Sequence, residues 1–216
     1  MTLIKEIMVK TIPAQKVTLL DLESQFNLER TSESQFFLEW QEDLPELNEL
    51  DKQVLDEVRA DYLHLSKLPI LEPIVKMVIL GPLFRRASFY RSPFYITAEK
   101  EVEITSEDEG TIIRGRLDLL VFTPEFWVTV IESKRTQFSL EAGIPQALAY
   151  MLGSPHKNKP ALGFVSNGPD FVFLKLVQET NPQYGRSQHF HIDTEGDLYT
   201  VLSILKKLAK IVSQKP

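Results

Sequence analysis

Apolar and polar positions alternate through much of the chain after residue 94, and this pattern predicts β-strands. Short polar turns such as SEDEG and TPEF separate the alternating segments. The second and third segments are apolar on both faces, which is typical of strands at the centre of a sheet. Six segments are expected to be strands: 94–105, 111–122, 127–134, 160–166, 171–177 and 187–192.

Helical spacing of apolar residues appears on both sides of these strands. It indicates a helix over 50–65, and a denser apolar run over 70–84 predicts a largely buried helix that ends at Gly81–Pro82. Ser139 is a suitable N-cap for a helix reaching Leu152, although Pro145 would also allow a start near Ile144. An amphipathic segment, 195–212, closes the chain. The order of elements predicts an α/β protein with a mixed β-sheet flanked by helices.

Charge divides the 216-residue chain into two parts. Residues 1–66 carry a net charge of −8 and are expected to form an acidic helical arm, whereas residues 67–216 carry +2 and form the core. A 43% apolar fraction argues against disorder, and the absence of cysteine excludes disulfides and thiolate chemistry. The N-terminus lacks the features of a signal peptide, and no apolar run is long enough to span a membrane. A cytoplasmic location is therefore expected.

Three charged residues interrupt the two most apolar strands: Asp118, Glu132 and Lys134. Charges are costly inside such strands unless they are paired or bound to a metal. A hairpin that pairs residues whose numbers sum to an even value near 250 would place Asp118 opposite Glu132. Two adjacent carboxylates without cysteine favour a hard ion, Mg²⁺ or Mn²⁺, with Lys134 able to orient water or stabilise negative charge.

The residues around this trio resemble a known signature. Three motifs follow one another: Gly115-Arg-Leu-Asp118, Glu132-Ser-Lys134 and Gln146-x-x-x-Tyr150. Their order and spacing are similar to G-x-x-D, E-x-K and Q-x-x-x-Y of the PD-(D/E)xK nuclease superfamily, whose members have a restriction-endonuclease-like fold. The N-terminal nuclease domain of type I restriction enzyme R subunits is similar over roughly residues 70–180. No G-x-x-x-x-G-K-[ST] motif is present, so the resemblance does not extend to a helicase motor.

The resemblance implies a role for each matching residue. It makes Asp118 and Glu132 metal ligands, together with the main-chain carbonyl of Ser133, and it makes Lys134 the catalytic lysine. Gln146 and Tyr150 would lie on one helical face towards the active centre. Glu72 is a further candidate ligand, and the candidate phosphate contacts are Arg85, Arg86 and Arg116.

The expected activity is Mg²⁺- or Mn²⁺-dependent hydrolysis of DNA phosphodiester bonds, with a role in restriction or repair. The resemblance also allows a homodimer, because many nucleases of this fold pair to cut two strands. The alternative is an inactive module of nuclease fold that binds nucleic acid or a protein partner.

Two simpler interpretations compete with a catalytic trio. Asp118 or Glu132 could form a structural salt bridge with a nearby arginine, although this would not explain the matching Gln146 and Tyr150. Glycoside hydrolysis by paired carboxylates would leave Lys134 without a role. His189 and His191 share a strand face but have no evident third ligand, so a structural role is expected for them.

Overall fold

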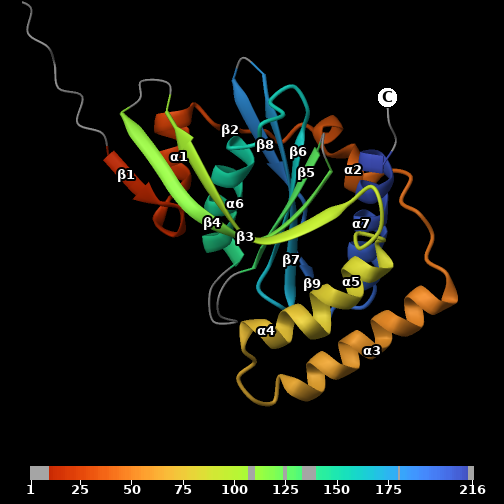
Figure 1. Ribbon diagram of the computed structural model, residues 1–216. Helices are drawn as coiled ribbons and strands as arrows, with labels where there is room; N and C mark the ends of the chain where they lie inside the picture. Colours follow the sequence, from red (N-terminus) through yellow and green to blue (C-terminus); the bar gives the residue numbers. More distant parts are fainter. Residues whose placement is uncertain (1–9, 107–109, 124–125, 133–139, 180, 214–216) are drawn as a thin grey trace, which may run out of the picture.

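The computed structural model describes residues 10–106, 110–123, 126–132, 140–179 and 181–213, without the side chains of residues 72, 117–119 and 126–132. It shows a mixed α/β protein in which one twisted sheet lies between two layers of helices (Figure 1). The expected fold class is therefore confirmed.

The sheet contains both parallel and antiparallel strands. Its main path runs β1-β4-β5-β6-β7-β8-β2, while β3 pairs with β4 and β9 pairs with β7. The hairpins β3–β4, β4–β5 and β6–β7 are antiparallel, whereas β5 and β6 are parallel and are connected through helix α6. The strands are β1 (Lys10–Pro13), β2 (Glu29–Arg30), β3 (Tyr95–Thr105), β4 (Thr111–Thr123), β5 (Phe126–Glu132), β6 (Ala161–Ser166), β7 (Asp170–Gln178), β8 (Pro182–Arg186) and β9 (Phe190–His191).

Each face of the sheet is covered by its own helices. Helices α1 and α6 cover one face, and α3, α5 and α7 cover the other, which divides the buried apolar residues into two clusters. The helical elements are α1 (Leu19–Phe26), α2 (Leu38–Gln41), α3 (Glu49–Leu65), α4 (Glu72–Val75), α5 (Gly81–Arg86), α6 (Leu140–Leu152) and α7 (Asp197–Ser213), with 3-10 turns η1 (Ala14–Lys16) and η2 (Ser34–Phe37) and the π-turn η3 (Lys76–Leu80).

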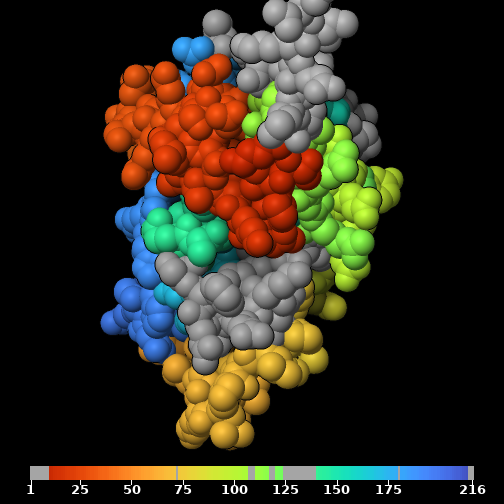
Figure 2. Space-filling model, turned by 90° about the vertical axis from the view of Figure 1, so that its left-hand side faces the viewer, coloured from red at the N-terminus to blue at the C-terminus, as the bar shows by residue number. Residues whose placement is uncertain are grey.

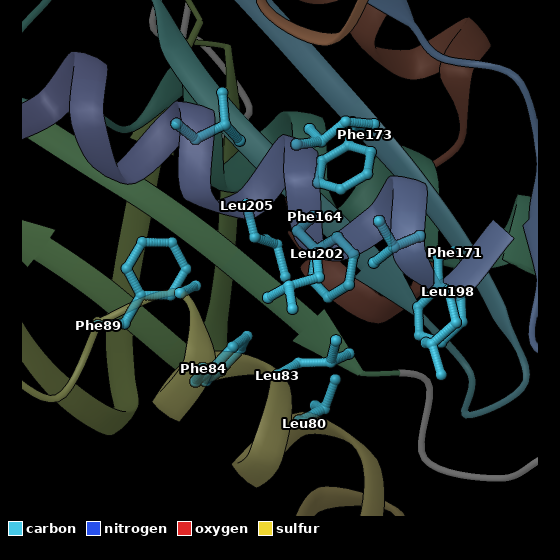
Figure 3. Close-up of a cluster of buried hydrophobic side chains, with 14 of the residues drawn as sticks. Leu80, Leu83, Phe84, Phe89, Phe164, Phe171, Phe173, Leu198, Leu202 and Leu205 are labelled. Atoms are coloured by element: carbon cyan, nitrogen blue, oxygen red, sulfur yellow. The ribbon is translucent and has the colours of Figure 1, made fainter. Parts of the chain in front are cut away.

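The cluster beneath α7 is rich in aromatic rings. Phe164 and Phe173 lie on adjacent strands β6 and β7 with their ring centroids 5.0 Å apart, and both are fully buried. Leu202 of α7 and Phe84 of α5 cover these rings from the helical layer (Figure 3). Burial of a large apolar side chain contributes about 1.5–3 kcal/mol. This cluster therefore holds α5 and α7 on the sheet.

The N-terminal segment is part of the sheet rather than a purely helical arm. Strand β1 pairs in parallel with β4, and β2 pairs in parallel with β8. Trp40 of α2 stacks on Phe173 with ring centroids 6.3 Å apart. Residues of the N-terminal part, red to orange in Figure 2, lie beside α6, and the contacts of η1 and α1 with α6 agree. The prediction of a helical arm is thus wrong for β1 and β2, which are too short and polar to show a strand pattern.

The helix expected over 70–84 differs from the structure in two respects. Gly81–Pro82 does not end it, because α4, η3 and α5 follow one another without a break. The Gly81 N–H donates to the Lys76 carbonyl, the wider spacing of a π-turn, and Pro82 then stands at the start of α5, where no N–H is needed. Met77 is 66% exposed, so the segment is amphipathic rather than largely buried.

The remaining elements agree with the sequence pattern except near the end of the sheet. Helix α6 begins at Leu140, before Pro145, while Ser139 lies outside the described residues. Strand β8 was not expected, and the strand expected over 187–192 is only the two-residue β9.

In the described part of the chain, no helix combines the length and apolar character needed to cross a membrane.

A buried carboxylate joins three helices on the α7 face. Asp51 is 0% exposed in the first turn of α3, where it forms a reciprocal capping box with Asn48. Arg86 of α5 donates its Nε to Asp51 Oδ1 at 2.6 Å, and Lys206 of α7 bonds to Oδ2. Burial raises the pKa of Asp51, but hydrogen bonds from Lys206 and Arg86 outweigh it and hold the pKa below its ordinary value of 3.8.

Replacing Asp51 with Asn is expected to lower the free energy of unfolding by about 3 kcal/mol, because it leaves two partly buried cations without their counter-charge. Urea unfolding followed by circular dichroism measures this change. Asp61→Asn is the matched control, because Asp61 lies on the same helix and is exposed. Equal stability of the two variants would show that the buried ion cluster does not hold the helices together.

The contribution of Asp51 to stability should also depend on pH. A carboxylate whose pKa is lower in the folded chain stabilises the fold above its unfolded pKa, and this contribution is lost as the pH falls through the folded value. The stability difference between wild type and Asp51→Asn should therefore be constant near neutral pH and shrink below about 3.8. Urea unfolding at a series of pH values tests this, and a difference that persists undiminished in acid would contradict it.

Candidate active site

Strand β4 has an incomplete edge at the first of the three motifs. Strand β3 pairs with β4 along one side from residue 112 to residue 122. On the other side, β1 pairs with residues 111–114 and β5 with residues 119–123. No described strand is paired with residues 115–118 on that second side. The motif Gly115-Arg-Leu-Asp118 therefore lies in a gap between two neighbouring strands.

Helix α6 places the third motif beside this gap. Tyr150 is 2% exposed, and its hydroxyl donates to the main-chain carbonyl of Arg116 at 2.9 Å. Gln146, one turn earlier on the same face, donates its Nε2 to the Tyr150 hydroxyl oxygen at 3.2 Å. Tyr150 and its neighbour Gln146 thus meet β4 beside Gly115, from which they are distant in the sequence.

Gly115 is required by the closeness of this packing. A Cβ at residue 115 would lie 2.4 Å from the Tyr150 hydroxyl oxygen and 2.4 Å from the Cβ of Ala14. Both distances are far below van der Waals contact, so no other residue fits without a shift of the helix or of η1. The glycine of the first motif is thus explained by packing against the tyrosine of the third.

The N-terminal end of α6 has a separate polar contact. Glu141 in its first turn accepts a hydrogen bond from Arg186 of β8 at 2.8 Å. That hydrogen bond is the main reason why the pKa of Glu141 lies below its ordinary value. The helix is therefore held at both ends, by Arg186 at its start and by the Tyr150 hydroxyl near its end.

The alternation of β4 is interrupted at the level of Asp118. Gly115 and Leu120 both face α6, although their odd spacing would place them on opposite faces of a regular strand. Strand β3 shows the same change, because Val102 belongs to the α6-side cluster and Ile96 packs against the α7-side cluster. Between them, Glu99 has a left-handed backbone with φ of 54°.

Glu99 lies at the same level as Asp118, between the pairs Ala98–Leu119 and Lys100–Leu117. Irregularities of this kind redirect side chains and are frequent beside active sites. The Asp118 side chain is not among the side chains that the structure describes. No pattern in the sequence indicated this interruption, because Glu99 is within an otherwise ordinary alternating segment.

The register of the β4–β5 hairpin corrects one expectation. Leu119 pairs with Val130 and Leu120 with Thr129, so the paired numbers sum to an odd value. The even-sum register, which would place Asp118 directly opposite Glu132, is therefore wrong by one residue. Glu132 is the last residue of β5, and its main chain lies level with Ser166 of β6. Asp118 and Glu132 thus remain on neighbouring strands, just beyond the paired part of the hairpin.

The other expected site residues lie wholly or partly outside the described part of the chain. Ser133 and Lys134 lie outside the described residues, as do the side chains of Glu132 and Glu72. The main chain of Glu72 begins α4, so its expected position on a helix before the sheet is confirmed. Among the described residues, no group of three or more histidine, aspartate or glutamate side chains is arranged to hold a metal ion.

The three candidate phosphate-binding arginines have different surroundings. Arg85 is exposed at the end of α5, whereas its neighbour Arg86 is bonded to the buried Asp51. Arg116, 55% exposed, forms ion pairs with Glu99 at 3.1 Å and Glu101 at 3.4 Å. A phosphate would therefore meet Arg85 in water and would compete with exposed carboxylates for Arg116.

A shallow groove borders the candidate site on β3 and β4. Its volume is about 460 Å³, and Gln15, Gly115 and Arg116 are among the residues that line it. Two acids and two arginines of the strands balance each other along it, and Arg114 pairs with Glu103 at 2.5 Å. The groove is accordingly close to electrically neutral.

The two histidines near the end of the sheet contact one carboxylate. His189 Nε2 lies 2.9 Å from Asp170 Oδ1, and His191 Nε2 lies 3.9 Å from the same atom. His191 Nδ1 also accepts the main-chain N–H of Asp193 at 3.1 Å. Both histidines therefore form local polar contacts at the start of β7, which agrees with the structural role expected for them.

Gly115→Ala is expected to lower the free energy of unfolding by about 2 kcal/mol, because the added methyl group overlaps Tyr150 and Ala14. Guanidinium unfolding measures the loss. Gly81→Ala is the matched control, since a Cβ there meets its nearest atom at 3.4 Å within a helix. If the two variants were equally stable, the close approach of α6 to β4 would be disproved.

A double-mutant cycle with Tyr150→Phe locates the origin of that loss. Alone, Tyr150→Phe removes the hydrogen bond to the Arg116 carbonyl and should cost about 1 kcal/mol. In the Gly115→Ala background it should cost less, because removing the hydroxyl relieves part of the overlap. Strictly additive effects would assign the loss to the contact with Ala14 instead.

Comparison with known proteins adds no relative on which a function could be based. No protein-family model matches the chain, and no curated protein matches it significantly. A function is therefore inferred from the three motifs and from the contact between Tyr150 and β4.

Proposed function

We propose that this protein is a metal-dependent nuclease that hydrolyses phosphodiester bonds of DNA, as its resemblance to the PD-(D/E)xK superfamily implies. The observation that supports this most is the hydrogen bond from the Tyr150 hydroxyl to the Arg116 carbonyl, beside Gly115. It joins the first motif to the third, which the sequence separates by about thirty residues. Contact between the first and third motifs is what a shared site requires.

The order of elements supports the same proposal. The first and third motifs lie on β4 and α6, Glu132 of the second is the last residue of β5, and α6 leads into β6 parallel to β5. Asp118 lies beside a gap in the sheet, and Glu132 lies at a strand end. The proposal thus puts the metal at an interruption of the sheet rather than within a continuous ladder.

The main-chain positions are compatible with a shared ion. Neighbouring strands lie about 4.8 Å apart, but the odd register would put Asp118 and Glu132 on opposite faces of a regular ladder. The proposal therefore requires the interrupted alternation of β4 between Gly115 and Leu120 to bring the two carboxylates to one face. The Ser133 carbonyl and the Glu72 carboxylate are the further oxygen donors in the proposal. Such a donor set suits Mg²⁺ or Mn²⁺, which when bound would polarise a phosphate and lower the pKa of a coordinated water.

The side chains of the protein would perform the remaining tasks. The Lys134 ammonium would stabilise negative charge that develops on the scissile phosphate or hold the attacking water. Tyr150 would act indirectly: its hydrogen bond to the Arg116 carbonyl holds the main chain two residues before Asp118. Tyr150 is thus a positioning residue, and Gln146 supports it.

The proposal is tested by plasmid cleavage in Mg²⁺ or Mn²⁺. Wild type should cut DNA, while Glu132→Ala and Lys134→Ala should each reduce the rate at least about a hundredfold. The matched controls are Glu57→Ala and Lys52→Ala, which change the same residue types on the exposed side of α3. Circular dichroism confirms that every variant is folded.

Equal cleavage by the wild type and both site variants would assign the activity to a contaminant and refute the proposal. If the wild type does not cleave DNA, calorimetric titration with Mn²⁺ distinguishes the two remaining explanations. Binding that Glu132→Ala abolishes would show that the metal centre is correctly assigned but the substrate is not. Absence of binding would favour the alternative, an inactive nuclease-fold module that binds nucleic acid or protein.

A further inference from the structure

A second concave site lies on the opposite side of the sheet from α6. It is formed where the C-terminal ends of α5 and α7 meet the segment that leads into β3, and its volume is about 340 Å³. Three cations and three hydroxyl groups line it: Arg86, Lys206, Lys210, Ser88, Ser92 and Ser213. None of the described residues that line it is acidic.

Two of the three cations, Arg86 and Lys206, are held in place by the buried Asp51. Arg86 lies 2.5 Å from Asp51 Oδ1 through a terminal nitrogen in addition to its Nε contact, and Lys206 bonds to Oδ2. Asp51 is fully buried, whereas the side chains of Arg86 and Lys206 are 24% and 22% exposed. The carboxylate therefore fixes both cations with part of each side chain turned to the surface. Pre-organised groups lose little entropy when a ligand binds.

The charge and the donors of the pocket suit an anion. Asp51 compensates one of the three positive charges, so two remain. A guanidinium carries five N–H groups and an ammonium three, more than the bonds to Asp51 use. The hydroxyls of Ser88 and Ser92 can donate further hydrogen bonds, whereas the Ser213 hydroxyl donates to the Ala209 carbonyl at 2.7 Å. A tetrahedral oxyanion accepts hydrogen bonds in several directions and matches this arrangement.

Compensation of helix dipoles does not account for the whole arrangement. Cations are expected in the last turns of α5 and α7, where helix carbonyls are negative. In α5, Arg85 meets that need as well as Arg86 but does not line the pocket, and Lys206 of α7 lines it although it lies before the last turn. The residues that line it combine cations and hydroxyls around a concave surface, with the Phe94 ring as an apolar wall. Its volume is at the small end of the range for ligand pockets, roughly 300–1,000 Å³.

We propose that this pocket binds a small phosphate-bearing anion, either inorganic phosphate or a phosphate monoester, through Arg86, Lys206 and Lys210. The proposal does not depend on nuclease activity, because the pocket shares no residue with β4, β5 or α6.

Calorimetric titration at constant ionic strength tests the proposal, with inorganic phosphate in one arm and methyl phosphate in the other. Wild type should bind at least one of them saturably, and the tighter of the two identifies the ligand class. Lys210→Gln should weaken that binding about fivefold, the effect of one exposed charge contact. Lys207→Gln is the control, since Lys207 is on the same helix but bonds to the carbonyls of Glu42 and Asp43.

Two results would overturn the assignment. The first is the absence of saturable binding of either probe by the wild type at millimolar concentration. The second is equal weakening by Lys210→Gln and Lys207→Gln, which would indicate a general effect of net charge. Lys210 is exposed, so its variant is expected to fold, and thermal unfolding without ligand checks this.

Discussion

The close approach of Tyr150 to Gly115 is the interaction on which the candidate site depends. The Tyr150 side chain of α6 packs directly on the main chain of β4 at Gly115, and its hydroxyl bonds to the Arg116 carbonyl. Asp118 follows only two residues later. The main chain next to the candidate aspartate is thus held by a helix that follows it in the chain, in addition to its pairing with β3.

This approach requires an incomplete strand edge. The pairing of β1 with β4 ends at Arg114, and that of β5 begins at Leu119. Buried main-chain carbonyls need hydrogen-bond partners, and in this gap a buried phenol provides one where a neighbouring strand otherwise would. The same stretch contains the change of faces that β3 accommodates through the left-handed Glu99. An open edge and an irregular strand therefore coincide at the candidate site.

The two helical layers are held to the sheet by different means. On the α6 side, apolar packing is supplemented by the hydrogen bonds of Tyr150 and Gln146 and by the contact between Glu141 and Arg186. On the α7 side, a buried carboxylate, Asp51, joins α3, α5 and α7 in addition to the aromatic cluster. A buried ion pair is costly to desolvate, so it gives more to the specificity of helix placement than to stability. It also orients two cations of the proposed anion pocket.

The sequence by itself determined the long elements, because their evidence is local. Helices α3 and α7 and the hairpin of β3 and β4 each show the periodicity of their own structure, and the three motifs could be assigned to strand, strand and helix. Only the tertiary structure decided the pairing of β1 and β2, the odd register of the β4–β5 hairpin, and the approach of Tyr150 to Gly115. These features arise between residues distant in the chain, where one-residue shifts change which side chains meet without changing any local pattern.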